Sequence, residues 1–340
     1  MPGPARMERK EHTMEHTRKQ SIRFGVLADL HVDIMPDTQR RLDIFLKDCR
    51  EHDVDFIMEL GDFCYPDDNR FVTCKEENMP VNIANGLRTK PWVDKRAIVK
   101  AWQEFPKPAY HVIGNHDTDM CAKRDICAFH GGHDCYYSFD CGQTHFIVLD
   151  ANYFRRDGEE VSYDHGNYFD AAKGDFPIIP KEQLDWLKAD LAKTNYPSIL
   201  FSHQSLAHDP RGIRNHKEPH EILKNAPGGV ILCMNGHEHI DAYSEEDGIA
   251  YVMLNSISNQ WLGEQYAAQR YEDEIEAKCP DVRYTAPYRD PVYAIVTVQE
   301  DCVRIQGVSS ELIPPLPQEL GYPAPVTAKV TSRIIPIRKR

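Results

Sequence analysis

Five short polar segments, each placed where an apolar run ends, constrain the fold of this chain most strongly. Two of those runs cover residues 22–29 and 54–60, and both read as short buried strands. Loops beyond the carboxyl ends of strands in an α/β sheet meet in one crevice, so we expect the five segments to form one cluster of polar side chains. The segments are Asp29-Leu30-His31, Gly61-Asp62, Gly114-Asn115-His116-Asp117, Ser202-His203 and Gly236-His237-Glu238-His239.

The order of the predicted elements indicates an α/β protein with more than one sheet. Strands at 22–29, 54–60 and 110–114 alternate with helices at 37–52 and 93–105, which is the pattern of right-handed crossover units. The second half of the chain continues with short apolar runs that largely lack intervening helices. Strands of this kind predict mixed pairing and a two-sheet core rather than a single doubly wound sheet. The runs cover residues 136–139, 145–150, 198–202, 230–234, 249–254 and 293–298.

Composition along the chain predicts three regions. Residues 1–20 are polar and read as a disordered lead-in, and residues 21–310 read as the folded domain, with an aromatic loop insertion near 152–180. Residues 311–340 read as a proline-rich tail that wraps the surface or is partly disordered. No apolar run has the length of a membrane helix or the pattern of a secretory signal, so we expect a cytoplasmic protein without a membrane partner.

The net charge limits the ligands that the chain can hold. The chain has 40 Lys and Arg against 53 Asp and Glu, a formal charge of −13, which argues against binding to a nucleic-acid duplex or an anionic membrane. Phosphate chemistry on such a chain needs a local source of positive charge, and metal ions are one such source. The ten cysteines read most simply as free thiols, although Cys121, Cys127, Cys135 and Cys141 are close enough in sequence for disulfides to form.

Spacing within the segments predicts two metal ions. Asp29 and His31 are two residues apart and face the same side of an extended chain, and His237 and His239 repeat this arrangement. The full set of candidate ligands exceeds the four of a tetrahedral zinc site and suits two ions that share a carboxylate. Imidazole, carboxylate and amide donors without thiolate favour Mn, Fe or Zn. The seven candidates are Asp29, His31, Asp62, Asn115, His203, His237 and His239.

The segments, read as D-x-H, G-D, G-N-H-[DE], an isolated H and G-H-x-H in this order, resemble the motifs of the calcineurin-like metallophosphoesterase superfamily. The resemblance spans residues 29–239. It implies a four-layer α/β/β/α sandwich with two mixed β-sheets. Gly61, Gly114 and Gly236 stand where the chain must pass close to neighbouring backbone.

The resemblance also implies a role for each site residue. The first metal would be held by Asp29, His31, Asp62 and His239. The second would be held by Asp62, Asn115, His203 and His237, so that Asp62 bridges the two ions. His116 would face the phosphoryl group as general acid, and Asp117 would accept a hydrogen bond from His116. The alternative for His116 is an orienting role without substrate contact.

The implied activity is hydrolysis of a phosphoester bond by a metal-bridging hydroxide, with a small, nucleotide-like phosphorylated substrate. The hairpin predicted at 137–150 and the aromatic loop after it resemble the arrangement in cyclic-nucleotide phosphodiesterases and ADP-ribose/CDP-alcohol diphosphatases. This favours a phosphodiester or a nucleotide pyrophosphate. The alternatives are a phosphomonoesterase, including a protein phosphatase, and a catalytically inactive binding scaffold of the same fold.

The sequence also suggests substrate contacts in two loops. His208, Arg211 and Arg214 follow His203 in a loop that contains Gly and Pro, and Arg is a natural bidentate partner of phosphate. The alternative is a solvated charged loop. Tyr168 belongs to the aromatic loop, which would stack on a nucleobase or pack over the sandwich edge. We expect Glu238, between two candidate ligands, to point outward.

Overall fold

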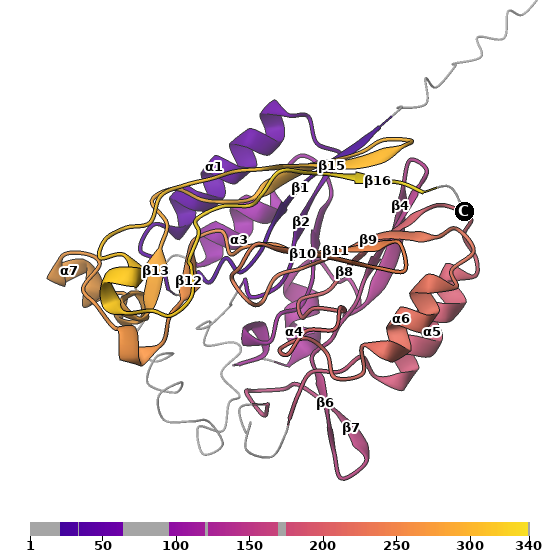
Figure 1. Cartoon of the computed structure of the whole chain (residues 1–340), viewed down its shortest axis with the longest axis horizontal. Helices are drawn as coiled ribbons and strands as arrows, with labels where there is room; N and C mark the ends of the chain where they lie inside the picture. The colour runs from indigo at the N-terminus through magenta and orange to yellow at the C-terminus, as the bar shows by residue number, and fades with distance from the viewer. Residues whose placement is uncertain (1–20, 33, 64–94, 120–121, 169–174, 339–340) are drawn as a thin grey trace, which may run out of the picture.

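The structure is a computed structural model that describes residues 21–338, except for 33, 64–94, 120–121 and 169–174 (Figure 1). The lead-in expected at 1–20 lies outside the described residues. So do the first residues of the helix expected at 93–105 and part of the loop expected at 152–180. Among the described residues, every helix is too short or too polar to span a bilayer.

The first sheet has six strands and combines parallel with antiparallel pairing. β1, β2 and β3 pair in parallel, whereas β14, β15 and β16 extend the sheet beyond β1 as antiparallel neighbours. In spatial order the strands are β16 (Arg333–Pro336), β15 (Cys302–Gly307), β14 (Ala294–Val298), β1 (Ile22–Leu27), β2 (Phe56–Glu59) and β3 (Ala109–His111).

The second sheet also has six strands and is also mixed. The four central strands β5, β8, β9 and β11 are parallel to one another, and β4 and β10 close the two edges as antiparallel strands. In spatial order the strands are β10 (Ala242–Glu246), β11 (Ile249–Met253), β9 (Val230–Asn235), β8 (Ser198–Phe201), β5 (Thr144–Val148) and β4 (Tyr137–Cys141).

The two sheets pack face to face between two layers of helices (Figure 1). Phe24 of the first sheet meets Phe146 and Phe201 of the second edge to face, with ring centroids 5.8 Å apart in both pairs. Helices α1 (Thr38–Glu51) and α3 (Lys95–Gln103) cover the outer face of the first sheet, and α5 (Lys181–Leu191) and α6 (Lys217–Lys224) cover that of the second. The predicted four-layer α/β/β/α sandwich is confirmed.

Short elements fill the connections. The loop expected at 152–180 begins with a hairpin of two short strands, and strands β10, β15 and β16 and helices α4 and α6 were not predicted from the sequence. The remaining elements are η2 (His116–Thr118), α4 (Lys123–Phe129), β6 (Tyr153–Arg156), β7 (Glu159–Ser162), β12 (Asn259–Trp261), η4 (Glu264–Tyr266), α7 (Asp273–Glu276), η5 (Pro280–Tyr284), β13 (Thr285–Pro287) and η6 (Pro317–Leu320).

The segment expected as a tail at 311–340 is instead part of the fold. Strand β16 pairs with β15, and Ala328, Val330 and Ile335 are buried in the core between the sheets. The prolines of this segment hide its strand from a sequence pattern, because they interrupt the apolar alternation on which strand prediction depends. The sheet therefore continues beyond residue 310.

Replacing Ile335 with Ala should lower the free energy of unfolding by about 2–5 kcal/mol, because the side chain is 4% exposed and its loss leaves a cavity. Ile334 on the same strand is 62% exposed, so Ile334→Ala should change stability by less than about 0.5 kcal/mol. Urea unfolding of the two variants measures the difference. Equal, small effects would mean that the final strand does not belong to the core.

Candidate metal centre

The carboxyl ends of parallel strands from both sheets carry the polar segments to one place. Asp29 comes two residues after β1, and Asp62 comes three residues after β2. From the second sheet, His203 comes two residues after β8, and His237 comes two residues after β9. Because the sheets face each other, these loops meet at one end of the sandwich.

The backbone of these loops is held in an unusual conformation. A positive φ is uncommon for residues with a side chain and costs about 1–3 kcal/mol per residue, so strain is concentrated here. Hydrogen bonds between the loops support it, from the Asp29 amide to the Gly61 carbonyl at 3.1 Å and from the His31 amide to the Asp62 carbonyl at 3.0 Å. Five of the seven candidate ligands have positive φ: Asp29 (54°), His31 (43°), Asp62 (58°), His237 (76°) and His239 (53°).

Gly114 shows why a glycine stands before the G-N-H-D turn. A Cβ at this position would lie 2.1 Å from both the backbone nitrogen and Oδ1 of Asp62. The close approach expected from the sequence is therefore confirmed here, and it lets the turn pack directly against the Asp62 carboxylate. In the same turn, the His116 amide donates a hydrogen bond of 2.8 Å to Asp62 Oδ1.

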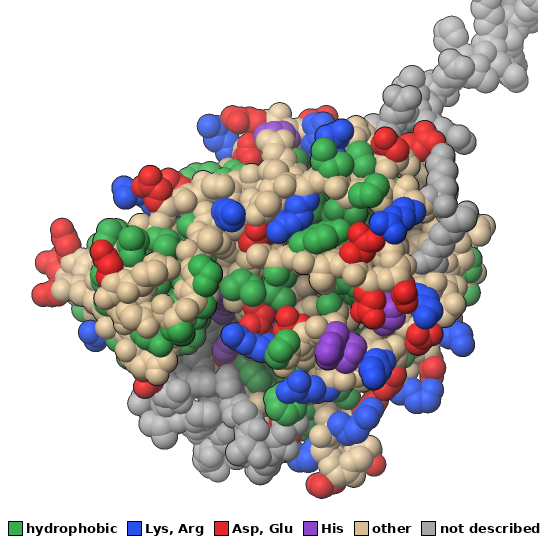
Figure 2. Space-filling model, viewed as in Figure 1, with side chains coloured by type: hydrophobic (Ala, Val, Ile, Leu, Met, Phe, Trp, Pro, Cys, Tyr) green, Lys and Arg blue, Asp and Glu red, His purple; other side chains and the backbone are tan. Residues whose placement is uncertain are grey.

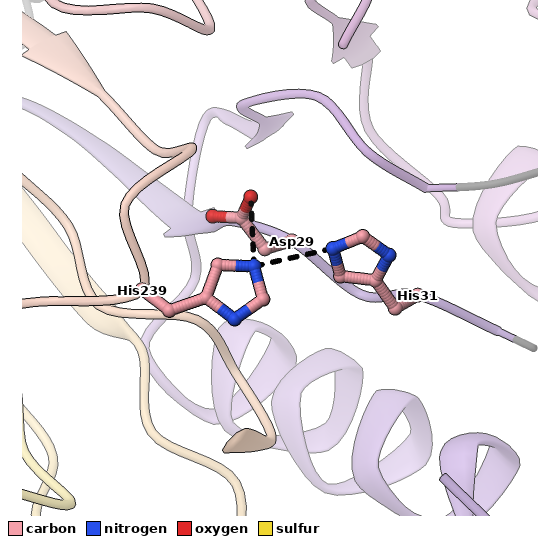
Figure 3. A group of neighbouring side chains, drawn as sticks. All are labelled: Asp29, His31 and His239. Carbon is pink, nitrogen blue, oxygen red and sulfur yellow. Dashed lines mark hydrogen bonds and ion pairs between the residues drawn. The ribbon is translucent and has the colours of Figure 1, made fainter. Parts of the chain in front are cut away.

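The first cluster consists of Asp29, His31 and His239, whose side chains point toward one another (Figure 3). The Nε2 atoms of His31 and His239 are 3.2 Å apart. His239 Nε2 is also 3.4 Å from Asp29 Oδ1. All three residues are buried. Three donor atoms thus converge on a space of the size that one metal ion takes.

The second cluster consists of Asp62, His203 and His237. His203 Nε2 lies 3.1 Å from Asp62 Oδ2 and 3.2 Å from His237 Nδ1. Asp62 Oδ2 also lies 3.7 Å from Nε2 of His31, a member of the first cluster. The Asp62 carboxylate therefore stands between the two clusters.

The hydrogen bonds of the histidines test whether these clusters suit metal ions. His203 Nδ1 contacts the Leu60 carbonyl at 2.8 Å and His239 Nδ1 contacts the Asn259 carbonyl at 3.0 Å. A carbonyl only accepts, so each Nδ1 carries a hydrogen, and each ring, once it is neutral, can direct the Nε2 lone pair into its cluster. Lone pairs and carboxylate oxygens that face one another need a cation between them, so the residues present fit a pair of metal ions.

Asn115 adds an unpaired acceptor to the same end of the sandwich. Its side-chain oxygen is buried and has no hydrogen-bond partner among the described residues. Its amide nitrogen contacts the Tyr168 hydroxyl at 3.4 Å, which leaves the oxygen as the available donor atom. A buried acceptor without a partner is costly, and an ion would satisfy it.

The pKa values of the second cluster follow from burial and charge. Burial alone would raise the pKa of Asp62, but His203, His116 and His31 together lower it well below its usual value. Burial opposes protonation of His203, yet the Asp62 carboxylate raises the pKa of His203 to about 9. Burial, followed by the positive charge of His203, lowers the pKa of His237 to about 3. Without a metal, one proton on His203 thus provides the positive charge of this cluster.

His116 contacts Asp119, and this corrects the partner expected from the sequence. His116 Nδ1 lies 2.9 Å from Asp119 Oδ2, and the Tyr168 hydroxyl donates to Asp119 Oδ1. Asp117 Oδ2 instead accepts hydrogen bonds from the backbone amides of Gly114 at 2.8 Å and Asp62 at 3.1 Å. The short helical turn η2 brings the residue three positions after His116 onto its ring.

Sequence reasoning therefore missed Asp119, and the signal that could have found it is the spacing of three within a helical turn. The role of Asn259 could not be predicted from its residue type, because it orients His239 through its backbone carbonyl. Tyr168 also stacks on Tyr163, with ring centroids 4.3 Å apart. Tyr168 thus packs on a neighbouring aromatic ring and contacts the site, and the two expectations for the aromatic loop stay predictions.

The three expected substrate contacts do not gather at one point. Arg214 lies over the Phe176 ring and donates to the Pro210 carbonyl, and the His208 ring packs against His216. Arg211 alone is joined to the site, since its Nη1 lies 2.6 Å from Glu238 Oε2.

Glu238 does not point outward as expected, because its side chain is only 7% exposed. This burial raises the pKa of Glu238 to about 7, against the opposing effect of Arg211. Its Oε1 lies 3.7 Å from His237 Nε2, so the Arg211–Glu238 ion pair is attached to a member of the second cluster. The Arg211 side chain is 73% exposed, which places a positive group at the rim of the site.

Comparisons with known proteins bear on the family and on the fold of this chain. The model of the calcineurin-like phosphoesterase family matches residues 22–241. A solved dimetal phosphatase from Danio rerio is similar in fold, with 16% sequence identity, a TM-score of 0.57 and coverage of 86% of this chain and 98% of that one. GAP50, the anchor in the inner membrane complex of Plasmodium, has 15% identity, a TM-score of 0.49 and coverage of 95% and 90%. No curated protein matches the chain.

Metal binding should release protons near pH 7. The raised pKa of His203 keeps its ring protonated below about pH 9 in the metal-free protein, whereas a metal ligand must offer the Nε2 lone pair. Titration of metal-stripped protein with Mn²⁺ in two buffers of different ionisation enthalpy should therefore show at least one proton released at pH 7, and less above pH 9. His203→Gln, which lacks this proton, should release correspondingly less. The absence of proton release at pH 7 would contradict the protonation state described above.

Proposed function

The chain belongs to the calcineurin-like phosphoesterase family of hydrolases, which act on phosphoester bonds, and from this premise we propose that its substrate is a phosphodiester or a nucleotide pyrophosphate. The observation that carries the proposal is the position of the Asp62 carboxylate between two clusters of metal-binding side chains, with His116 beside them. Two clusters joined by one carboxylate suit a substrate whose reaction needs concentrated positive charge.

In this proposal the two clusters hold two ions, and the ions are Mn, Fe or Zn, since nitrogen and oxygen donors surround both positions. Asn115 contributes its unpaired oxygen to the second ion. A bound pair of ions would supply the positive charge that offsets a phosphate and would lower the pKa of the attacking water. The structure from Danio rerio, which has a similar fold, is described as a dimetal phosphatase, and this supports two ions rather than one. The first ion would take Asp29, His31, Asp62 and His239, and the second Asp62, Asn115, His203 and His237.

His116 is proposed as the general acid. Its side chain is 40% exposed, whereas the Asp62 side chain next to it is 2% exposed, so the ring can reach a substrate that approaches from solvent. In the protonated ring Asp119 accepts the Nδ1 hydrogen, which orients the ring, and the second proton, on Nε2, would go to the leaving oxygen. Asp117 keeps the turn in place by accepting from two backbone amides. A general acid of this kind contributes about 10²–10⁴-fold to the rate.

The surface supports a small substrate rather than a nucleic-acid duplex. On the face drawn in Figure 2, the Lys and Arg side chains of the described residues are interspersed with Asp and Glu rather than gathered in one field. A duplex is bound by many phosphate contacts along a continuous basic surface, and the acidic net charge of −13 opposes such contacts.

Choice of a diester or pyrophosphate over a monoester rests on two features. The β4–β5 hairpin is followed by an aromatic segment, and the Tyr168 hydroxyl of that segment contacts Asp119 and lies 3.5 Å from Nδ1 of His116, the proposed general acid. Arg211 provides an exposed positive group at the rim of the site, and in this proposal it binds the second phosphate of a pyrophosphate. A phosphomonoesterase of the same fold is the alternative, and a substrate panel separates the two.

His116→Ala should reduce kcat by at least about 10²-fold while two metals remain bound, because the ring gives a proton and does not hold an ion. Asp62→Ala should lower both the rate and the metal content, since it removes the shared carboxylate. Metal analysis of both purified variants measures the bound metal, and hydrolysis of bis(p-nitrophenyl) phosphate measures the rate. Equal metal loss in the two variants would show that His116 is a ligand.

The same assay addresses the inactive-scaffold alternative. The wild-type protein should lose activity on chelation and regain it with Mn²⁺. A scaffold would show no turnover with Mn²⁺, Fe²⁺ or Zn²⁺, and that result would overturn the proposed activity.

Arg211→Ala should raise KM for a nucleoside diphosphate sugar about tenfold or more, because a charged hydrogen bond to the second phosphate contributes roughly 1.5–3 kcal/mol. KM for bis(p-nitrophenyl) phosphate, which has a single phosphate, should change little. Arg214→Ala is the matched control, since that side chain is held over Phe176 and should leave both values unchanged. A wild-type protein that prefers p-nitrophenyl phosphate to both substrates would favour the phosphomonoesterase alternative.

A further inference from the structure

A pair of thiols stands apart from the candidate metal centre. Cys127 lies in α4 and Cys135 lies just before β4, and their Sγ atoms are 3.2 Å apart. Both are free thiols and both are half-buried. Two sulfurs in van der Waals contact on separate elements need only small side-chain movements to form a bond.

The surroundings make the two thiols unequal. The two sulfurs share one hydrogen bond, and in the arrangement in which Cys135 donates, this bond lowers the pKa of Cys127 and raises that of Cys135. The Lys123 ammonium, one turn earlier in α4, has a smaller effect that lowers the pKa of both thiols. A thiolate is the reactive form of cysteine, so Cys127 has the character of a nucleophile and Cys135 that of a resolving thiol.

The chain between the two cysteines can adjust to a bond. Gly131 and Gly132 have φ values of 96° and 86°, and a Cβ on either would meet no atom within 4 Å. Residues 131–134 are exposed, so solvent and small oxidants have access to this turn. The turn thus combines freedom of the backbone with access from outside.

We propose that Cys127 and Cys135 form a peroxide-sensitive dithiol that closes into an intramolecular disulfide. The Cys127 thiolate attacks one oxygen of hydrogen peroxide, the O–O bond breaks, and a sulfenic acid forms while the other oxygen leaves as water after protonation. The Cys135 sulfur then attacks the Cys127 sulfur, the S–S bond forms, the S–O bond breaks, and a second water leaves. Two thiols and one peroxide give one disulfide and two waters.

The disulfide would tie α4 to the start of β4, next to the supports of the metal centre. Lys123 of α4 donates to Asp150 Oδ2 and to the Asn152 carbonyl, each at 2.6 Å. The Asn152 side chain in turn accepts from Gln204, the residue after His203, at 2.8 Å. The disulfide would therefore add a covalent link between α4 and the residue just before β4, close to the Lys123 contacts. The proposal stands on this geometry alone and does not depend on the proposed activity.

The test is oxidation of the full chain with one to two equivalents of hydrogen peroxide, followed by alkylation of the remaining thiols and chymotryptic mapping by mass spectrometry. We expect a reducible cross-link between the peptides that contain Cys127 and Cys135, and two fewer alkylated thiols than in the reduced protein. The oxidised protein should melt a few degrees higher, because a disulfide restricts the unfolded chain.

Variants separate this pair from the other cysteines. Cys127→Ser and Cys135→Ser should each abolish the cross-link and the rise in Tm. Cys141→Ser removes another half-buried cysteine, on β4, and should leave both unchanged. A cross-link from either cysteine to a different partner, over-oxidation without a cross-link, or no reaction at either thiol would each overturn the proposal.

Discussion

The buried carboxylate of Asp62 is the group on which the arrangement of the site depends. Its charge is taken out of water at the junction of the two sheets, which is costly unless positive charge comes close. Three histidines and the His116 amide surround it, and their combined effect keeps it ionised despite burial. The same carboxylate keeps a proton on His203 in the metal-free protein. Metal ions would take the place of that proton. The fold therefore holds several acceptor atoms close together, and a bound cation would offset their charge.

The backbone explains why such a site can exist. Five candidate ligands have left-handed backbone conformations, and the loops that carry them are joined by amide–carbonyl bonds across strand ends. Gly114 allows the turn that carries His116 to lie directly against Asp62. Burial of apolar side chains between the sheets stabilises the fold enough to offset the cost of these backbone conformations. Functional sites in proteins are often strained in this way.

The residues predicted a two-sheet core with mixed pairing and the meeting of the segments, because both follow from simple rules, whereas the four layers were implied by the family resemblance. Parallel strands place their carboxyl ends at one edge, so the order of strands and polar residues along the chain is enough to group Asp29, Asp62 and His203. Other features depend on contacts that no local pattern encodes. The partner of His116 is Asp119 rather than Asp117, because a turn of helix η2 intervenes. Prolines around strand β16 hide it from a sequence pattern, and the burial of Glu238, in an ion pair with the exposed Arg211, has no local signal.

The central claim is that two ions lie on either side of the Asp62 carboxylate. Anomalous diffraction from crystals of this protein soaked with Mn²⁺ tests it most directly. The account predicts two anomalous peaks, one among Asp29, His31 and His239 and the other among His203, His237 and Asn115, with Asp62 between them. A single peak, or peaks that lie away from these side chains, would contradict it.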